Sequence, residues 1–204
     1  LVVDGKPVQW DEPAAAELWA LYKPKRCVST LRDPEGRPTV RDYFPKSAQG
    51  RLYPIGRLDY DAEGLLLLTN DGDLAQRVAH PSFEVSRVYL VKVKGVVSVE
   101  TVAKLMRGIK LDGRTRTSRV RILHVVGDKT WLEVILNEGV HHHIKRMFAA
   151  VAHSVLKIKR YQVGPIELGD MKPGDCRKLG KAEINQLLER AASVKPRALA
   201  VPVD

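Results

Sequence analysis

Residues 56–73 read GRLDYDAEGLLLLTNDGD, and this stretch decides the fold of the segment around it. A loop rich in glycine and carboxylates runs directly into the apolar run 65–68, which has the length of a buried strand. The strand ends at an Asn-Asp-Gly turn, where Asp71 or Asp73 is placed to cap the helix that contains Leu74, Ala75 and Val78. We therefore expect a loop, a strand, a turn and a helix in immediate succession.

The segments that follow alternate between strand and helix patterns. Apolar side chains recur at every second position in 87–94 and 119–122, and 131–136 is apolar enough for a buried strand. A turn at Gly127-Asp128 joins the last two segments as a hairpin. Helical spacing occurs in three further segments, which are 99–106 with Ser98 as its cap, 144–151 and 184–191. The stripe expected to be buried in the first of these helices is Val99, Val102, Ala103 and Met106. Such intermixed elements predict an α+β fold with a mixed, mainly antiparallel sheet flanked by helices.

The composition describes a globular chain with an excess of positive charge. Of 204 residues, 34 are Lys or Arg and 24 are Asp or Glu, which gives a net charge of +10 and a pI near 9.7. A hydrophobic fraction of 44% argues against a largely disordered chain, and no apolar run approaches the roughly 18 residues of a membrane span. The first residues lack the pattern of a secretory signal, and two cysteines make neither a disulfide framework nor a zinc cluster. We therefore expect a soluble, cytoplasmic protein that binds no metal and no membrane.

The basic residues gather in two stretches in which acidic residues are scarce. The stretch 103–121 contains one acid, Asp112, and 141–160 contains none. This clustering favours contacts with phosphate groups, and nucleic acid is the usual polyanionic partner of a basic domain. A solvated basic face without a partner is the alternative. The basic residues concerned are Lys104, Arg107, Lys110, Arg114, Arg116, Arg119 and Arg121 in the first stretch and Lys145, Arg146, Lys157, Lys159 and Arg160 in the second.

Asp59 is the carboxylate that is hardest to explain as a structural residue. It lies between Arg57 and the apolar run, where it can be partly desolvated beside a cation. Taken singly, however, an aspartate in a loop is more often structural or solvated, Tyr89 is an ordinary half-buried strand aromatic, and Lys145 is a solvated helix residue. The chemistry of single residues therefore leaves their roles open.

Five segments resemble the bacterial ribosomal-RNA pseudouridine synthases, in the branch that modifies single uridines in small- or large-subunit RNA. GRLD at 56–59, with the GLL and TNDG that follow it, is similar to the catalytic motif of this family. RVYLV at 87–91 is similar to its second motif, and NEGVHHHIKRMF at 137–148 is similar to its third. KP at 23–24 and DPEGR at 33–37 also match the branch and lean toward its large-subunit members. Several motifs in the family's order are more specific than any one alone.

The resemblance covers about residues 18–180 and departs from the family pattern at two positions. The family commonly has a basic residue at the position of Val140 and a glutamine at the position of His143. His142 matches the usual histidine of the motif. These departures concern the RNA contacts near the start of the third motif's helix and leave the synthase assignment standing.

The reaction that the resemblance implies is an isomerisation. The C1′–N1 glycosidic bond of a uridine breaks, the uracil turns, and it rejoins the ribose through C5. This redox-neutral reaction needs no cofactor, in keeping with a chain that has no P-loop, GxGxxG motif or cysteine cluster.

The resemblance also implies a central basic active-site cleft and roles for its residues. Asp59 is the catalytic carboxylate, Tyr89 stacks on the uracil, and Lys145 is expected to pair with Asp59. Arg57 is expected to hold the phosphate of the flipped nucleotide or to fill the space that it leaves. From charge and resemblance together, the residues expected to bind RNA are Arg57, His142, Arg146, Arg114, Arg116, Arg119, Lys157 and Arg160.

We expect three parts along the chain and one main partner. Residues 1–17 are expected to be the remnant of an N-terminal RNA-binding domain with its linker, 18–192 the catalytic domain, and 193–204 a flexible tail. The partner is ribosomal RNA, on which the protein acts as a monomer. A non-catalytic RNA-binding or ribosome assembly factor with the same fold is the alternative. A metal-assisted hydrolase built on 141–143 is a weaker one, because the sequence places no third ligand beside these histidines.

Overall fold

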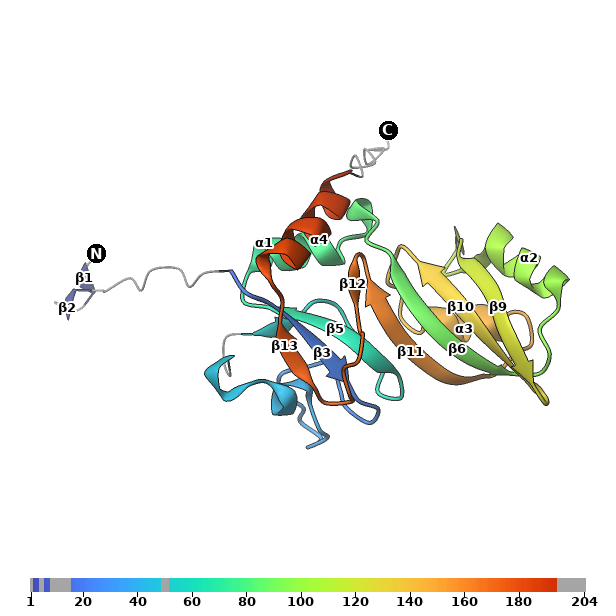
Figure 1. The fold of residues 1–204 in the computed structure, drawn as a ribbon, viewed down its shortest axis with the longest axis horizontal. Coiled ribbons are helices and arrows are strands. Elements are labelled where there is room, and N and C mark those ends of the chain that lie inside the picture. Colours follow the sequence, from blue (N-terminus) through green and yellow to red (C-terminus); the bar gives the residue numbers. More distant parts are fainter. Residues whose placement is uncertain (1, 4–5, 8–15, 49–51, 194–204) are drawn as a thin grey trace.

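One large mixed sheet runs through the part of the chain that this computed structural model describes, which is residues 2–3, 6–7, 16–48 and 52–193 (Figure 1). Two short hairpins, β1 with β2 and β7 with β8, lie outside this sheet. The strands are β1 (Val2–Val3), β2 (Lys6–Pro7), β3 (Leu18–Lys23), β4 (Tyr53–Pro54), β5 (Glu63–Thr69), β6 (Arg87–Lys94), β7 (Ile109–Leu111), β8 (Arg114–Arg116), β9 (Arg119–Val126), β10 (Lys129–Leu136), β11 (Val155–Val163), β12 (Ile166–Glu167) and β13 (Cys176–Lys178).

The large sheet follows the order β13-β3-β5-β11-β6-β10-β9, with β12 beside β11 and β4 beside β5. Its strand pairs are antiparallel except for β5 and β11, which are parallel. The predicted α+β fold with a mixed, mainly antiparallel sheet is thus confirmed. The helices are α1 (Gly72–Ala79), α2 (Val99–Arg107), α3 (His143–Ala149) and α4 (Lys181–Ser193), with short 3-10 helices η1 (Val40–Tyr43), η2 (Lys46–Ala48) and η3 (Pro81–Phe83).

Local sequence signals correctly predicted the starts of α1 and α2 and the hairpin between β9 and β10. Asp71 caps α1, because its carboxylate accepts hydrogen bonds from the backbone N–H groups of Asp73 at 2.9 Å and Leu74 at 3.1 Å. Ser98 caps α2 in the same way, by accepting from the Thr101 N–H at 3.2 Å. The hairpin predicted at Gly127 joins β9 to β10.

The buried stripe of α2 differs from the prediction. Leu105 is fully buried, and Val102 packs against the same core cluster. Val99 and Met106, predicted to be buried, are 74% and 46% exposed. The reason is that α2 packs on β9 at the edge of the sheet, where it buries only one narrow stripe of its surface.

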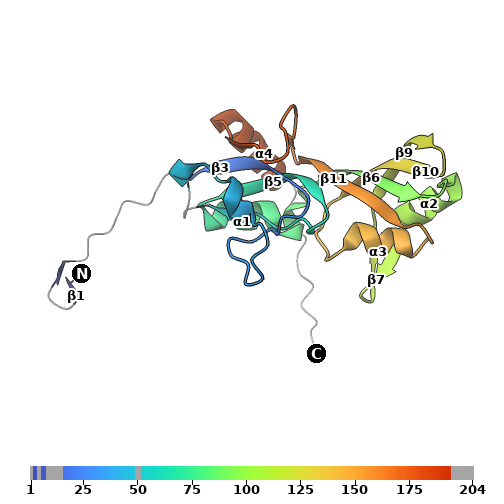
Figure 2. The same cartoon turned by 90° about the horizontal axis from the view of Figure 1, so that it is seen from below.

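The two ends of the sheet are covered by different helices. The side chains of Tyr89, Val91 and Val93 on β6 enter a core cluster to which α2 and α3 contribute Leu105 and Phe148. Both helices therefore cover the same face of β11, β6, β10 and β9, as Figure 2 shows. The other end of the sheet has separate clusters, one of which is closed by α1 and α4 (Figure 1).

The two ends of the sheet meet where β5 pairs with β11 in parallel. In this pairing Lys159 lies opposite Glu63 and Arg160 lies opposite Gly64. Gly64 has a φ of 116°, and a Cβ atom there would lie 2.1 Å from the carbonyl oxygen of Arg160. Only glycine allows this close approach of the two backbones. The catalytic motif therefore carries a glycine that joins the halves of the sheet.

The two terminal parts expected from the sequence lie mostly outside the described residues. In 1–17 the structure describes the β1–β2 hairpin and residues 16–17, and 194–204 are not described. Among the residues that are described, no helix is long and apolar enough to cross a membrane.

Candidate active site

The loop that carries Asp59 is fixed from both sides by hydrogen bonds. The hydroxyl of Ser29 donates to the Leu58 carbonyl at 2.8 Å and accepts from the Leu58 N–H at 3.1 Å. The Ala62 N–H donates to the Asp59 carbonyl at 3.1 Å, which closes a tight turn. Leu58 and Ala62 are buried in the core cluster below the loop. Because its neighbours on both sides are anchored, the backbone of Asp59 has a fixed position.

Lys23, at the end of β3, supports this turn from below. Its side chain is fully buried, and its ammonium group donates to the carbonyls of Ala62 at 2.8 Å and Pro24 at 2.9 Å. Burial lowers the pKa of Lys23 to about 8, although nearby acidic groups, among them Cys27 and Asp59, oppose that shift. From the sequence, Lys23 is expected only as part of the KP match at 23–24. The available signal was a lysine that ends an apolar strand directly before a proline.

Asp59 lies between two basic side chains of the α3 region. Its carboxylate is 3.8 Å from the ammonium nitrogen of Lys145 and 3.7 Å from Nε2 of His142. The hydrogen bond of Lys145, at 2.7 Å, goes instead to Asp61. Partial burial works to raise the pKa of Asp61, but this hydrogen bond holds it below its usual value. Lys145 therefore lies within ion-pair distance of Asp59, as expected. Its ammonium group also pairs with Asp61, which was not among the predicted site residues.

A pocket of about 340 Å³ opens beside Asp59. Tyr89 forms part of its wall and is only 8% exposed. Arg57 and His142 lie at the same pocket, and both side chains are exposed. The volume falls in the range of pockets that hold small ligands. The sequence-predicted residues Asp59, Tyr89, Arg57 and His142 are therefore brought together from three separate segments of the chain.

Two arginines from neighbouring strands add positive charge to this pocket. Arg160, which is predicted to bind RNA, is only 3% exposed. Its Nε donates a hydrogen bond to the Leu65 carbonyl at 2.7 Å, and its guanidinium lies 6.0 Å from the centre of the Tyr89 ring. Arg87 donates to the last carbonyls of α1, and burial, with Arg160 nearby, lowers its pKa. Within the described part of the chain, neither arginine forms an ion pair with a carboxylate. Arg160 is thus a pocket residue, and Arg87 is a pocket residue that the sequence analysis missed.

The three consecutive histidines occupy the turn into α3, where the rings of two of them stack on each other and the third is buried. His142 has a φ of 52°, and its ring stacks on that of His141 at 3.8 Å. His143 is 4% exposed, lines the pocket, and has no hydrogen-bond partner for either ring nitrogen. Burial lowers the pKa of His143. The residues that the structure describes include no group of three side chains able to hold a metal ion.

Several of the predicted RNA-binding arginines are engaged in ion pairs. Arg146 forms a two-pronged pair with Asp112 at 2.7 and 2.8 Å, which ties the β7–β8 hairpin to α3. Arg116 pairs with Glu138, a residue of the pocket. Arg114, at the start of β8, is exposed. Of these three arginines, Arg116 therefore contacts a pocket residue, and both Arg116 and Arg146 already have a carboxylate partner.

Arg119 and Lys157, which are also predicted to bind RNA, are not among the residues that line the pocket. Strand register places both on the face of the sheet opposite the pocket, where Lys157 pairs with Glu63 at 2.8 Å. Arg119 and Lys157 therefore do not line the pocket, and their expected contact with RNA stays a prediction. Charge along a sequence does not reveal on which face of a strand each side chain lies.

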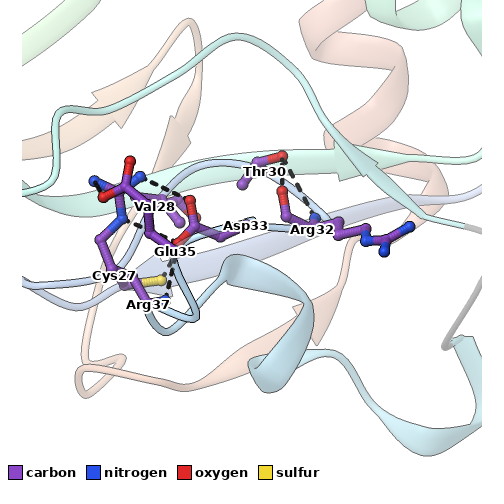
Figure 3. Close-up of polar contacts among 7 residues, drawn as sticks. All are labelled: Cys27, Val28, Thr30, Arg32, Asp33, Glu35 and Arg37. Atoms are coloured by element: carbon purple, nitrogen blue, oxygen red, sulfur yellow. Dashed lines mark hydrogen bonds and ion pairs between the residues drawn. The ribbon is translucent and has the colours of Figure 1, made fainter.

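A loop before the motif is also ordered by its own polar contacts (Figure 3). Arg37 donates to Asp33 from its side chain at 2.7 and 3.0 Å and from its backbone at 2.9 Å. The Thr30 hydroxyl donates to the Arg32 carbonyl at 3.1 Å. Because the hydroxyl of Ser29 in this loop donates a hydrogen bond to the Leu58 carbonyl, the loop and the catalytic motif are connected.

The chain is similar to known proteins of one family. A family model described as RNA pseudouridylate synthase matches residues 17–150, which include Asp59, Tyr89 and Lys145. The chain belongs to this family. As an RNA pseudouridine synthase, the protein is an isomerase.

Named relatives cover most of this pseudouridine synthase. It is 39% identical to the ribosomal large subunit pseudouridine synthase B of Bacillus subtilis (strain 168), over 91% of this chain and 75% of that protein. It is 41% identical to an uncharacterized RNA pseudouridine synthase of Aquifex aeolicus (strain VF5), over 92% and 74%. The crystal structure of a pseudouridylate synthase superposes with a TM-score of 0.76 at 31% identity, over 88% of this chain and 76% of that one.

Proposed function

We propose that this synthase converts a uridine of large-subunit ribosomal RNA to pseudouridine, with Asp59 as its catalytic carboxylate. The observation that carries the proposal is the position of Asp59 at a pocket whose wall includes Tyr89, with Lys145 3.8 Å away. The large-subunit substrate is supported by relatives in Bacillus subtilis and Pseudomonas aeruginosa that are named ribosomal large subunit pseudouridine synthase B.

The target uridine must leave its stack to reach Asp59, which costs a few kcal/mol. The Tyr89 ring in the pocket wall offers a surface on which the uracil stacks. Arg57 is exposed at the rim and forms no ion pair with another described residue, so its guanidinium is available to fill the vacated space or to hold a phosphate. The pocket therefore has groups suited to capture an extruded nucleotide.

Asp59 acts in one of two ways. As a nucleophile, its carboxylate attacks C1′ and displaces the uracil, and the resulting ester bond breaks when C5 of the turned uracil attacks C1′. As a base, it removes the proton from C2′ as the uracil leaves, which gives a glycal, and it returns that proton to C2′ when C5 bonds to C1′. In both routes the C1′–N1 bond breaks, a C1′–C5 bond forms, and the proton on C5 passes to solvent while N1 gains one. Lys145 and His142 hold the carboxylate in place. The reaction is redox-neutral and needs no cofactor.

The cationic groups of the pocket suit an RNA substrate. Arg87 and Arg160 have no carboxylate partner among the described residues, and a nucleotide that enters the pocket brings anionic phosphate and polar uracil oxygens toward them. Because ribosomal RNA is its substrate, we place the protein in the cytoplasm.

The test is release of tritium from RNA labelled at uracil C5. Unmodified large-subunit RNA fragments incubated with the protein release tritium to water, and Asp59→Asn abolishes the release because the amide neither attacks C1′ nor removes a proton. Asp73→Asn is the matched control, since this exposed aspartate at the start of α1 lies away from the pocket. Equal release by wild type and Asp59→Asn refutes the role of Asp59.

The non-catalytic alternative gives a different result in the same assay. A pure RNA-binding or assembly factor binds the fragments with a steep dependence on salt but releases no tritium from any of them. The absence of release from all large- and small-subunit fragments favours that alternative. Release from small-subunit fragments alone corrects the substrate and leaves the role of Asp59 intact.

A further inference from the structure

Four antiparallel strands of the sheet, β11, β6, β10 and β9, have one face that no helix covers in the described part of the chain (Figure 2). On β6, Tyr89, Val91 and Val93 point into the core under α2 and α3. Since side chains alternate along a strand, the residues between them, such as Lys92, point to the opposite side. We call this uncovered side the open face.

Strand register identifies the other side chains of the open face. Lys92 lies opposite Trp131 on β10 and opposite Lys157 on β11, and Trp131 lies opposite His124 on β9. The same alternation gives the remaining members. The basic residues of the open face are Lys92, Lys94, Arg119, Arg121, Lys129, Lys157 and Lys159, and its aromatic residues are His124, Trp131 and Tyr161.

Positive charge on the open face is only partly neutralised. Glu133 accepts from Arg121 at 3.0 Å and from the Tyr161 hydroxyl, and Glu63 pairs with Lys157. Lys92, Lys94, Arg119 and Lys159 form no ion pair with any described residue. Of these, Lys94 and Arg119 are exposed. The open face therefore carries an excess of positive charge that a polyanion can neutralise.

An aromatic ring lies in the middle of this charge. Trp131 is half-buried; the Lys92 ammonium lies 5.3 Å from the centre of its ring and the His124 ring 6.0 Å away. A flat ring on a strand, flanked by cations, is the arrangement on which unpaired bases stack while lysines contact their phosphates. An acidic protein segment would use the charges but not the ring.

We propose that the open face is a second RNA-binding surface, which holds a single-stranded segment of RNA apart from the target uridine. The pocket with Asp59 and Tyr89 opens on the helix-covered side of the same strands, so one nucleotide does not reach both places. The proposal goes beyond the isomerisation of uridine, because it concerns binding alone and does not require Asp59.

The test uses a fluorescein-labelled dodecamer of adenylate, which contains no uridine and so does not enter the pocket as substrate. The open-face variant is Lys92→Gln, Lys94→Gln and Arg119→Gln combined. We expect it to bind the probe about tenfold more weakly than wild type at low salt, and the slope of log K against log salt to fall by about 2, since each single-strand phosphate contact contributes about 0.7. Fluorescence anisotropy measures both quantities.

The matched control removes three charges from the other end of the sheet, away from the open face and the pocket. Lys25→Gln, Arg41→Gln and Lys46→Gln, all exposed near the end of β3 and on η1 and η2, are expected to leave the affinity within about twofold of wild type. Equal binding by wild type and the open-face variant, or an equal loss in the control variant, overturns the proposal. A melting temperature measured for each variant separates loss of contact from loss of fold.

Stacking of a base on Trp131 is tested separately, by tryptophan fluorescence. The adenylate dodecamer is expected to quench tryptophan fluorescence in wild type and to quench it much less in Trp131→Phe. Unchanged quenching in that variant overturns the stacking contact. If polyglutamate displaces the probe as effectively as unlabelled adenylate does, the open face binds acidic proteins instead. None of these outcomes bears on tritium release, so failure here and failure of the proposed function are distinguishable.

Discussion

At the scale of a single residue, we expect the buried His143 to make the folded protein sensitive to acid. His143 is nearly inaccessible and lacks a hydrogen-bond partner for either ring nitrogen. Burial lowers its pKa, while Glu138 opposes the shift and Arg116 and Arg146 add to it. In the unfolded chain a histidine binds its proton at a pH near 6.5. The folded state therefore holds fewer protons than the unfolded state just below that pH, and folding there becomes less favourable.

We expect His143→Gln to remove this acid sensitivity. In wild type, the contribution of His143 to the free energy of unfolding is fully present above about pH 6.5 and is lost as the pH falls below it, because the unfolded chain takes up the proton first. The variant has no such group. Urea unfolding at pH 7.5 and at pH 5.0 measures the difference between the two proteins. If that difference is the same at both values, His143 titrates normally and is not responsible.

At the scale of a single element, α1 is small but connects the motif to the pocket. Asp71 caps its first turn, and the carbonyls of Val78 and Ala79 near its last turn accept hydrogen bonds from Arg87. Leu74 and Val78 bury its inner face. A helix of this length depends on its cap and on tertiary packing, because it is too short to be stable alone.

Loss of the cap is therefore expected to be measurable. Asp71→Ala leaves two N–H groups at the start of α1 without their acceptor and should lower the free energy of unfolding by about 1 kcal/mol. Chemical denaturation checks this value. Asp71→Asn serves as the control, because an asparagine oxygen caps nearly as well, and it should cost only a few tenths of a kcal/mol. Equal losses for both substitutions would show that charge, and not the cap, is what matters.

At the scale of the whole molecule, the two ends of the sheet have separate core clusters and meet at the pairing of β5 with β11. The pocket lies at this junction, since Arg57 and Asp59 precede β5, Tyr89 lies on β6, and Arg160 on β11. Anything that separates β5 from β11 therefore affects the site and the fold together.

Gly64→Ala is the substitution that tests the junction. Its Cβ atom would overlap the Arg160 carbonyl, and its φ of 116° is unfavourable for alanine. We expect the free energy of unfolding to fall by about 2–5 kcal/mol, and tritium release to fall with it. The control is Gly72→Ala, where the added atom would make only an ordinary contact, 3.6 Å from the Tyr53 hydroxyl. A Gly64→Ala protein as stable as wild type would mean that the backbones of β5 and β11 can move apart to accommodate the added atom.

Much of this molecule could be predicted because the relevant signals are local. Alternation in 87–94 specifies β6, the Gly127 turn specifies the hairpin, and Asp71 specifies the start of α1. Each signal depends on residues a few positions apart, whose relative directions are fixed by strand or helix geometry. The resemblance of three motifs pointed to the family for a similar reason, since each motif is a short continuous segment.

The tertiary structure alone decided which partners the charged residues have. It gave Lys145 a second carboxylate, paired Arg146 with Asp112, and set Lys157 on the face opposite Arg160. The packing of α2 at the sheet edge likewise decided that Leu105 is the buried residue of its stripe. The sequence by itself determined β5, β6, β9, β10, the helices α1 to α4 and the residues of the motif, because backbone geometry acts over a few residues. The strands β3 and β11 were not predicted. The register between distant strands determined everything that faces the pocket or the open face, because a contact between residues a hundred positions apart leaves no mark on either segment's local pattern.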